Sequence, residues 1–319
     1  EMLSRETQPS PRYMEVFQQA FAMSRTRMAE GLLDLAAIIA ARRQGEITLV
    51  SLARAGTPIG VILKHILEEI FQRETLHYSV SIIRGRGIDR NAIRFILDAE
   101  GRAPAGLVFI DGWTGKGVIA RELTQALEDF ERDHGVRLDA SLFTLADLAG
   151  VGIAPSDEDY LIPSSILNAT MSGLISRSVL NEQIGPKDFH GCMLYQELAS
   201  QDLSIWLVDT LLADAKARIL AGYEPNATPV DPSQARERST RLIATIQRRF
   251  GLADVNLIKP GIGEATRVLL RRVPERLLVR DPQAPEVAHL RQLAQEKAVR
   301  CEVDPTLPYQ AISIIKGLP

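Results

Sequence analysis

The chain has 319 residues, of which 45% are hydrophobic and 24% charged, with a formal net charge of −3 and a mean hydropathy of −0.01. This length predicts two domains, and this composition excludes a collagen-like, low-complexity or largely disordered chain. No run approaches about eighteen consecutive apolar residues, so we expect no membrane partner. The chain starts at Glu1 without a signal-peptide pattern, and we expect a cytoplasmic protein whose natural N-terminus is shortened here.

The charge is divided unevenly along the chain. Three prolines fall within Glu224–Ser233, a composition typical of a linker. Residues 236–319 carry a net charge of +6, whereas residues 1–235 carry −9. We therefore predict a basic module attached to an acidic body. The predicted divisions are a helical hood over 1–45, a main domain over 46–222, a linker over 223–235 and the basic domain over 236–319.

The first predicted element is a long helix from about Pro11 to Arg43, in which apolar residues recur at helical intervals. Three short apolar runs follow, at Ile47–Val50, Tyr78–Ile83 and Gly106–Ile110. Each run ends in a polar loop that contains glycine and leads into a helical pattern. This alternation predicts an α/β fold with a parallel sheet, which binds ligands beyond the carboxyl ends of its strands. We assign no detailed structure to residues 142–178.

An acid and a glycine-rich turn follow the third run and precede a helical pattern. Asp111 follows the strand, and Thr114, Gly115, Lys116 and Gly117 precede the helical pattern. Backbone amides and the helix dipole favour an anion at such a turn, and a threonine hydroxyl and a lysine add to this preference. The spacing differs from that of a Walker A loop, which disfavours a nucleotide triphosphatase.

The other two runs also end in loops suited to anions. Arg54, Ala55 and Gly56 follow the first run and suggest a second anion subsite. Arg84 and Arg86 follow the second run, in a glycine-containing loop that we expect to be mobile and able to close over an anion. Three such loops after successive strands are an improbable coincidence for merely solvated turns.

This order of strands and loops resembles the type I phosphoribosyltransferases. The segments VSLARAGTPIG, HYSVSIIRGRGID, VFIDGWTGKG, LIPSSILNATMSGLISRS and DFHGC are more closely similar to a phosphoribosyltransferase of bacterial tellurite-resistance and stress gene clusters, whose members are often called cysteine protease StiP. The resemblance implies a type I phosphoribosyltransferase-like sheet and a transfer from phosphoribosyl pyrophosphate to an acceptor base, with release of pyrophosphate and help from Mg²⁺. The product would be a nucleoside-like metabolite of a stress-resistance pathway. The resemblance also leaves a homodimer open.

The same resemblance implies roles for individual residues. Asp111 would stabilise the oxocarbenium-like transition state, while Arg84 and Arg86 close over the leaving group. The 5′-phosphate would bind Thr114, Gly115, Lys116 and Gly117, and pyrophosphate would bind Arg54, Ala55 and Gly56. Candidates for the acceptor pocket are Ser164, Ser165, Asn168, Ser172 and Arg177. The metal ligands are unknown.

The basic domain contains a glycine-rich turn before a basic helix, which can receive a phosphodiester. The turn resembles the Gly-x-Asn-Glu-x-Thr-Lys motif of Pelota-like and kink-turn-binding ribosomal proteins, with Gly261, Glu264 and Thr266 retained. Gly263 replaces the Asn and Arg267 replaces the Lys. The resemblance implies a small α/β/α fold, with strands near 277–279 and 299–303. The RNA-binding candidates are Lys259, Gly261, Gly263, Glu264 and Arg267. A packing domain with a solvated basic face is the alternative.

Two further functions remain open. Cys192 and His190 lie two residues apart and would share a face of an extended segment, which suggests a cysteine hydrolase, although no third orienting residue is evident. The second alternative is a non-catalytic RNA-binding sensor of phosphoribosyl pyrophosphate. Cys192 and Cys301 are far apart in sequence and fit neither a disulfide framework nor a zinc site.

Overall fold

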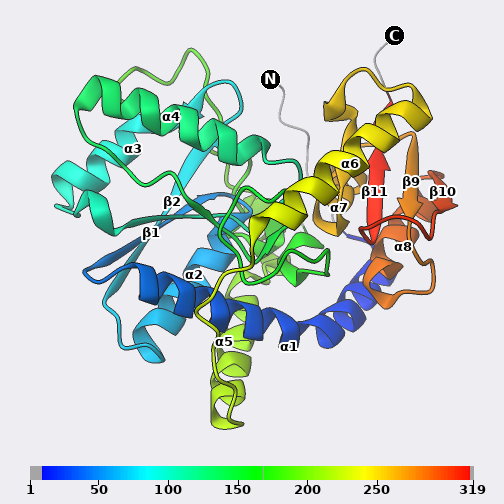
Figure 1. Cartoon of the computed structure of the whole chain (residues 1–319), viewed down its shortest axis with the longest axis horizontal. Helices are drawn as coiled ribbons and strands as arrows, with labels where there is room; N and C mark the ends of the chain where they lie inside the picture. Colours follow the sequence, from blue (N-terminus) through cyan, green and yellow to red (C-terminus); the bar gives the residue numbers. More distant parts are fainter. Residues whose placement is uncertain (1–8, 168, 317–319) are drawn as a thin grey trace.

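The computed structural model describes residues 9–167 and 169–316, which form a main α/β sheet and a second, smaller sheet (Figure 1). The α-helices are α1 (Pro11–Arg42), α2 (Gly56–Glu69), α3 (Arg90–Arg94), α4 (Val118–His134), α5 (Ser204–Leu220), α6 (Pro232–Phe250), α7 (Ile262–Arg271) and α8 (Ala288–Glu296). A π-helical turn, Phe95–Ala99, extends α3. Short 3-10 turns occupy Pro104–Gly106, Pro163–Ser165, Ala169–Met171, Gln196–Gln201, Val255–Leu257 and Pro285–Val287.

The main sheet has the strand order β3-β2-β1-β4-β6. Its strands are β1 (Ile47–Ala53), β2 (Thr75–Ile83), β3 (Gly87–Ile88), β4 (Leu107–Ile110) and β6 (Leu142–Phe143). The strands β2, β1, β4 and β6 are parallel, and β3 folds back antiparallel on β2. A separate parallel pair joins β5 (Trp113–Thr114) to β7 (Ala146–Asp147). The predicted α/β fold with a parallel sheet is confirmed.

Helix α1 begins where the sequence predicts, because the side chain of Ser10 accepts a hydrogen bond from the N–H of Tyr13 and Pro11 occupies the first turn. Its apolar face lies in a core that also contains residues of α2, α5 and α8. Fourteen of its residues are buried. Instead of standing apart as a hood, α1 is thus a core helix, and Figure 1 shows it running below the sheet toward α8.

The connection between the domains is shorter than predicted and is fixed to the body. Helix α5 ends at Leu220 and α6 begins at Pro232, with Asp231 as its N-cap, so the last residues of the predicted linker are helical. The hydroxyl of Tyr223 and the N–H of Asn226 both donate to Asp34 of α1, at 3.0 and 2.8 Å. This segment therefore holds the domains together rather than separating them.

The C-terminal domain has the strand order β10-β9-β11-β8. Its strands are β8 (Ile258–Pro260), β9 (Arg276–Val279), β10 (Arg300–Val303) and β11 (Ala311–Ile314), and β9 and β10 lie close to the predicted positions. Apolar residues of α7 and α8 belong to the same buried cluster as those of α1. The two domains therefore share a hydrophobic core. Among the described residues, no helix is both long enough and apolar enough to cross a membrane.

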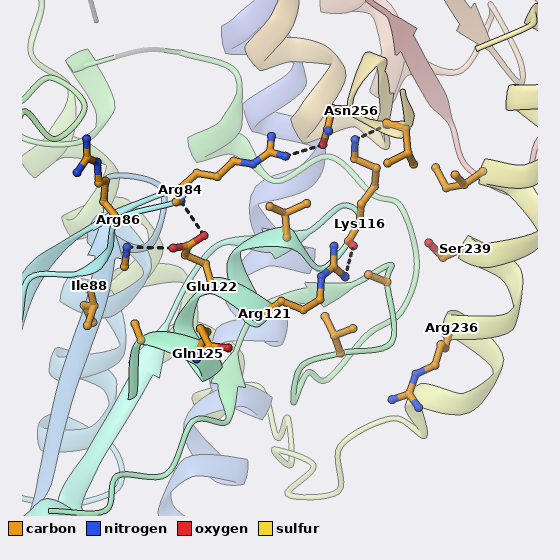
Figure 2. Close-up of a pocket in the computed structure, with 18 of the residues that line it drawn as sticks. Arg84, Arg86, Ile88, Lys116, Arg121, Glu122, Gln125, Arg236, Ser239 and Asn256 are labelled. Carbon is orange, nitrogen blue, oxygen red and sulfur yellow. Dashed lines mark hydrogen bonds between the residues drawn. The ribbon is translucent and has the colours of Figure 1, made fainter. Parts of the chain in front are cut away.

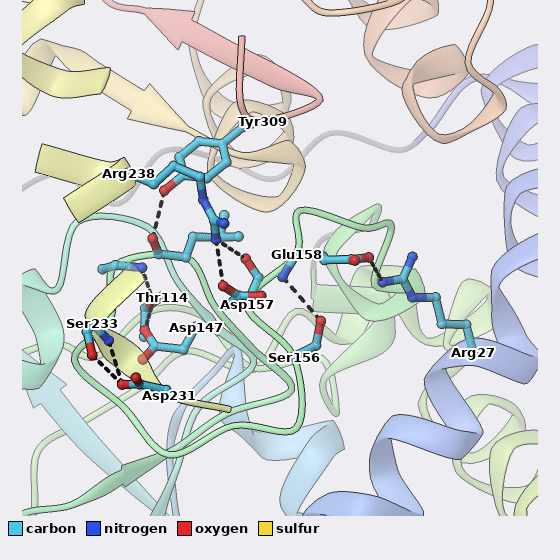
Figure 3. A network of polar contacts seen from close by, with 12 residues as sticks. Arg27, Thr114, Asp147, Ser156, Asp157, Glu158, Asp231, Ser233, Arg238 and Tyr309 are labelled. Carbon is cyan, nitrogen blue, oxygen red and sulfur yellow. Dashed lines mark hydrogen bonds and ion pairs between the residues drawn. The ribbon is translucent and has the colours of Figure 1, made fainter. Parts of the chain in front are cut away.

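One loop of the main domain, residues 156–160, is bound by side chains of both α1 and α6. Arg238 of α6 donates to Asp157, and Arg27 of α1 donates to Glu158 (Figure 3). Beside them, the buried carboxylate of Asp159 accepts the N–H of Ile262 at 2.9 Å and that of Gln310 at 2.8 Å. Burial raises the pKa of Asp159 to about 6 although these N–H groups lower it. Asp159 thus joins the main domain to the start of α7.

We predict that Asp159→Asn lowers the free energy of unfolding by about 1–3 kcal/mol. Asp159 accepts backbone N–H groups on both oxygens, so an amide NH₂ would leave one of them unsatisfied, and this loss exceeds the gain from removing a charge that burial disfavours. Urea unfolding at neutral pH measures the loss. Glu158→Gln is the matched control, since its exposed ion pair contributes less than about 1 kcal/mol. Equal losses in the two variants would contradict the role of Asp159.

Candidate functional site

Three polar loops leave the same edge of the main sheet. The strands β2, β1 and β4 are adjacent and parallel, so the loops that begin at Arg84, Arg54 and Asp111 follow neighbouring carboxyl ends. A cavity of about 330 Å³ lies beside the third loop, and Arg84, Asp111 and Lys116 line it. We call this space the edge cavity.

The C-terminal domain supplies the opposite wall of the edge cavity. Three of the residues predicted to bind RNA line this wall, Lys259, Glu264 and Arg267, and Arg271 and Arg272 lie with them. A Cβ atom at Gly263 would lie 2.3 Å from the Trp113 ring, so only glycine permits this approach. The guanidinium of Arg267 lies 5.7 Å from the centre of the same ring. The sequence predicts each motif but not that the two are in contact.

Seven arginines and lysines and only two acids line the edge cavity, so it favours an anion. Burial raises the pKa of Asp111 to about 6, although Arg267 and the N–H of Gly112 lower it. Burial and the nearby Lys259 lower the pKa of Lys116 to about 8. Burial would raise the pKa of Glu264, but Arg267 and Lys259 outweigh this effect and lower it.

Thr114 does not offer its hydroxyl to a ligand. The side chain is buried, and its Oγ1 donates to Oδ1 of Asp147 at 2.5 Å and accepts the N–H of Ala149 at 3.0 Å (Figure 3). Both bonds hold the Asp111 loop against β7. Gly117 has a left-handed backbone (φ 69°) and precedes α4, while Lys116 donates to the carbonyl of Val255 at 2.7 Å. The hydroxyl of Thr114, which we expected at a phosphate, is thus already bonded within the chain.

The turn formed by Arg54, Ala55 and Gly56 supports the sheet. Arg54 is buried and donates to the carbonyl of Ile175 at 2.7 Å. A Cβ atom at Gly56 would lie 2.3 Å from the carbonyl oxygen of Ile110, so the turn packs directly on the end of β4. Arg54 is thus directed to Ile175, and it is not among the described lining residues of the edge cavity.

The loop that contains Arg84 and Arg86 is tied to helix α4. The N–H groups of Gly85 and Gly87 both donate to the carboxylate of Glu122 at 2.9 Å (Figure 2). Arg84 donates to Oδ1 of Asn256 in the C-terminal domain at 2.9 Å, whereas Arg86 is exposed. The sequence analysis missed Glu122, because an acid on the polar face of a helix gives no local signal of its partner.

The residues proposed for an acceptor pocket do not form one site. Ser165 lines a small separate space beside Trp113 and Asp159, and Ser172 is buried elsewhere. Arg177 alone of these lines the edge cavity. Asn168 lies outside the described residues, and Ser164 is half-buried.

A second candidate site is the hairpin that contains Cys192. Residues Val179 and Gly191 form an antiparallel bridge, which makes the backbone around Cys192 extended. Cys192 is exposed. Nδ1 of His190 lies 2.8 Å from Oγ of Ser81 on β2, and its backbone N–H donates to the buried Asp89 at 2.6 Å. His190 is therefore fixed by two groups that sequence reasoning did not identify.

Comparisons with known proteins decide the family. A family model described as tellurite-like stress resistance cysteine protease StiP matches residues 1–212, and the PELOTA RNA binding domain matches residues 237–317. A protein of Acinetobacter baylyi (strain ATCC 33305 / BD413 / ADP1) named cysteine protease StiP is 36% identical over all of this chain and 85% of its own length. The chain belongs to the StiP family.

This assignment corrects the predicted chemistry. The StiP family model and the relative are both named cysteine proteases, so the prediction of a phosphoribosyl pyrophosphate-dependent transferase is wrong. Neither phosphoribosyl pyrophosphate nor an acceptor base is supported as a ligand. The alternative of a sensor that binds phosphoribosyl pyrophosphate is therefore not supported either. The tellurite-like stress context and the Pelota domain agree with the predictions.

The edge cavity does not fit the Mg²⁺ that the earlier resemblance implied. Its two carboxylates, Asp111 and Glu264, already face Arg267, and Glu264 is 3.0 Å from it. In the described ranges, no group of three His, Cys, Asp or Glu residues could hold a metal ion. An abundance of cations around isolated carboxylates suits an anion better.

The Pelota motif faces inward in this StiP-family chain. Gly261 and Gly263 approach Leu148 and Trp113 of the main domain, and Glu264 and Arg267 pair with each other. Lys259 is half-buried in the edge cavity. The motif therefore forms part of the contact between the domains.

We predict that Asp111→Asn stabilises the chain at pH 7. The pKa of Asp111 rises from 3.8 to about 6 on folding, so the folded chain keeps the proton to higher pH and stability falls as pH rises through this window. Asparagine keeps the bond from the N–H of Gly112 but carries no charge. The thermal midpoint should rise by about 2 °C at pH 7 and stay unchanged near about pH 3.5. An equal shift at both pH values would contradict this.

Proposed function

We propose that this chain is a cysteine-dependent peptidase in which Cys192 is the nucleophile. The observation that carries the proposal is that Ser81 and Asp89 both hold His190, two residues before the exposed Cys192 and within the segment matched to the StiP family. Residues i and i+2 of an extended segment project to the same side, so the imidazole and the thiol share a face. A neighbouring imidazole is what a cysteine nucleophile needs for activation.

Ser81 gives His190 its orientation in this proposal. If Nδ1 donates to Oγ of Ser81, Nε2 is the basic nitrogen and is left to accept the thiol proton. The proton passes from Cys192 to Nε2, Sγ bonds to the peptide carbonyl carbon, and the C–N bond breaks as His190 returns the proton to the amine. Water then hydrolyses the thioester and restores the thiol.

The surface around Cys192 suits a peptide. Four large apolar side chains near it are substantially exposed: Leu180, Phe189, Met193 and Leu194. The ring of Phe189 also packs edge-on against Phe95 at 5.8 Å. An apolar substrate side chain that covers this patch would gain about 25 cal/mol for each Å² removed from water. We therefore expect cleavage next to apolar residues.

Cys301 is the weaker candidate and serves as the control. It lies on β10, outside residues 1–212, and burial raises the pKa of its thiol. A raised pKa reduces the thiolate that would attack a peptide. Cys301 therefore differs from Cys192 in lying outside the segment matched to the StiP family.

Hydrolysis of fluorescein-labelled casein tests the proposal. Cys192→Ala should lower the rate by about 100-fold or more, whereas Cys301→Ala should keep the wild-type rate. Ser81→Ala should lower kcat by about 10-fold with little change in KM, because it frees the imidazole to turn. Full casein cleavage by Cys192→Ala would overturn the assignment of the nucleophile.

We also propose that the C-terminal domain gives the chain affinity for RNA. The match of residues 237–317 to the Pelota RNA-binding domain and the net charge of +6 over residues 236–319 support this. Binding through phosphates should weaken steeply as salt rises, which fluorescence anisotropy with a labelled RNA oligonucleotide measures. Affinity that does not change with salt, or no affinity, would contradict the proposal.

A further inference from the structure

A large groove separates helix α4 from helix α6. Its volume is about 1370 Å³, four times that of the edge cavity, and its walls come from both domains. Figure 2 shows Lys116 and Arg121 between the Arg84–Arg86 loop on one side and Arg236 of α6 on the other. We call this space the interdomain groove. It exceeds the size of a typical small-molecule pocket.

The groove is strongly cationic. Six arginines and lysines line it, against the two acids Glu122 and Asp129. Glu122 is occupied by the N–H groups of Gly85 and Gly87, and Asp129 faces Arg132 of its own helix. Both acids are already bonded within the chain, so the groove can attract an anion while these bonds stay in place.

Four of the six cations donate to neutral oxygens, whereas Arg90 pairs with Asp133. Lys116 donates to the carbonyl of Val255. Arg84 donates to the side chain of Asn256, Arg121 to the carbonyl of Lys116, and Arg236 to the carbonyl of Gly150. A carbonyl or amide oxygen orients a guanidinium without cancelling its charge. The groove thus presents positioned positive charges along both walls, which is the electrostatic pattern of a phosphate track.

We infer that the interdomain groove binds the phosphate backbone of RNA. The inference rests on the proposed RNA binding and assigns it a location. The Pelota motif does not provide that location, because it faces the main domain. The described lining of the groove combines its cations with polar and aliphatic side chains, and it contains no aromatic ring for base stacking. Recognition is therefore through phosphates and tolerates most sequences.

Anisotropy with an RNA strand of about 20 nucleotides tests the inference in the full chain, at salt from about 50 to about 200 mM. Arg86→Ala combined with Arg121→Ala should reduce the slope of log affinity against log salt by about 1.4. Arg42→Ala combined with Arg137→Ala is the matched control, because both residues are exposed and lie outside the groove lining. This control should keep the wild-type slope.

A second pair of variants tests the opposite wall. Thr240 is exposed on α6 and lines the groove. Thr240→Glu should weaken RNA binding by repulsion, whereas Thr240→Gln, of similar size and no charge, should not. This pair changes no residue of the cysteine site.

The outcomes separate the two proposals. A wild-type chain without salt-dependent affinity for RNA would overturn RNA binding itself. A wild-type chain that binds RNA, with groove variants that match their controls, would overturn the groove and leave RNA binding in place. Tighter binding of a DNA strand of the same sequence would overturn the assignment to RNA.

Discussion

The contact between Gly263 and Trp113 is the constraint on which the arrangement of the two domains depends. Any side chain at position 263 would overlap the indole, and the carboxylate of Asp159 holds the neighbouring N–H of Ile262 at 2.9 Å. With this turn in place, α7 and α8 complete the core around α1. The edge cavity and the interdomain groove each take walls from both domains, so both exist only because this contact forms.

Local patterns in the sequence predicted the elements that are long or strongly apolar. The strands β1 and β4 and the helices α1 and α4 lie where periodicity and glycine-rich turns placed them, because each buries a continuous apolar face. Strand β2 also covers its predicted run, although only Thr75 and Val80 in it are buried. The strands β3, β5 and β7 have two residues each, so their pairing is decided by tertiary contacts. Local patterns could not predict the contact between the domains either, since Gly263 and Trp113 lie far apart in sequence.

The candidate site was predicted in composition but not in chemistry. Arg84, Asp111 and Lys116 do meet at one sheet edge, as parallel strands require. The free hydroxyl expected at Thr114 is instead committed to Asp147, and the arginine expected at pyrophosphate is buried against Ile175. A cluster of cations shows that the site favours an anion, but it does not specify a reaction. The match to the StiP family therefore changes the predicted reaction without changing the predicted preference for an anion.

One hairpin links the cysteine site to the interdomain groove. The strands β2 and β3 pair through Ile82 with Ile88 and Ile83 with Gly87, and the basic loop spans their tip. Ser81, just before this pairing, holds the imidazole of His190, and Asp89, just after it, holds the His190 backbone. The tip itself is bound to Glu122 in the groove. The loop that forms one wall of the groove therefore connects the same two strands, β2 and β3, whose ends hold His190. The position of the imidazole and the shape of the groove thus depend on a single hairpin.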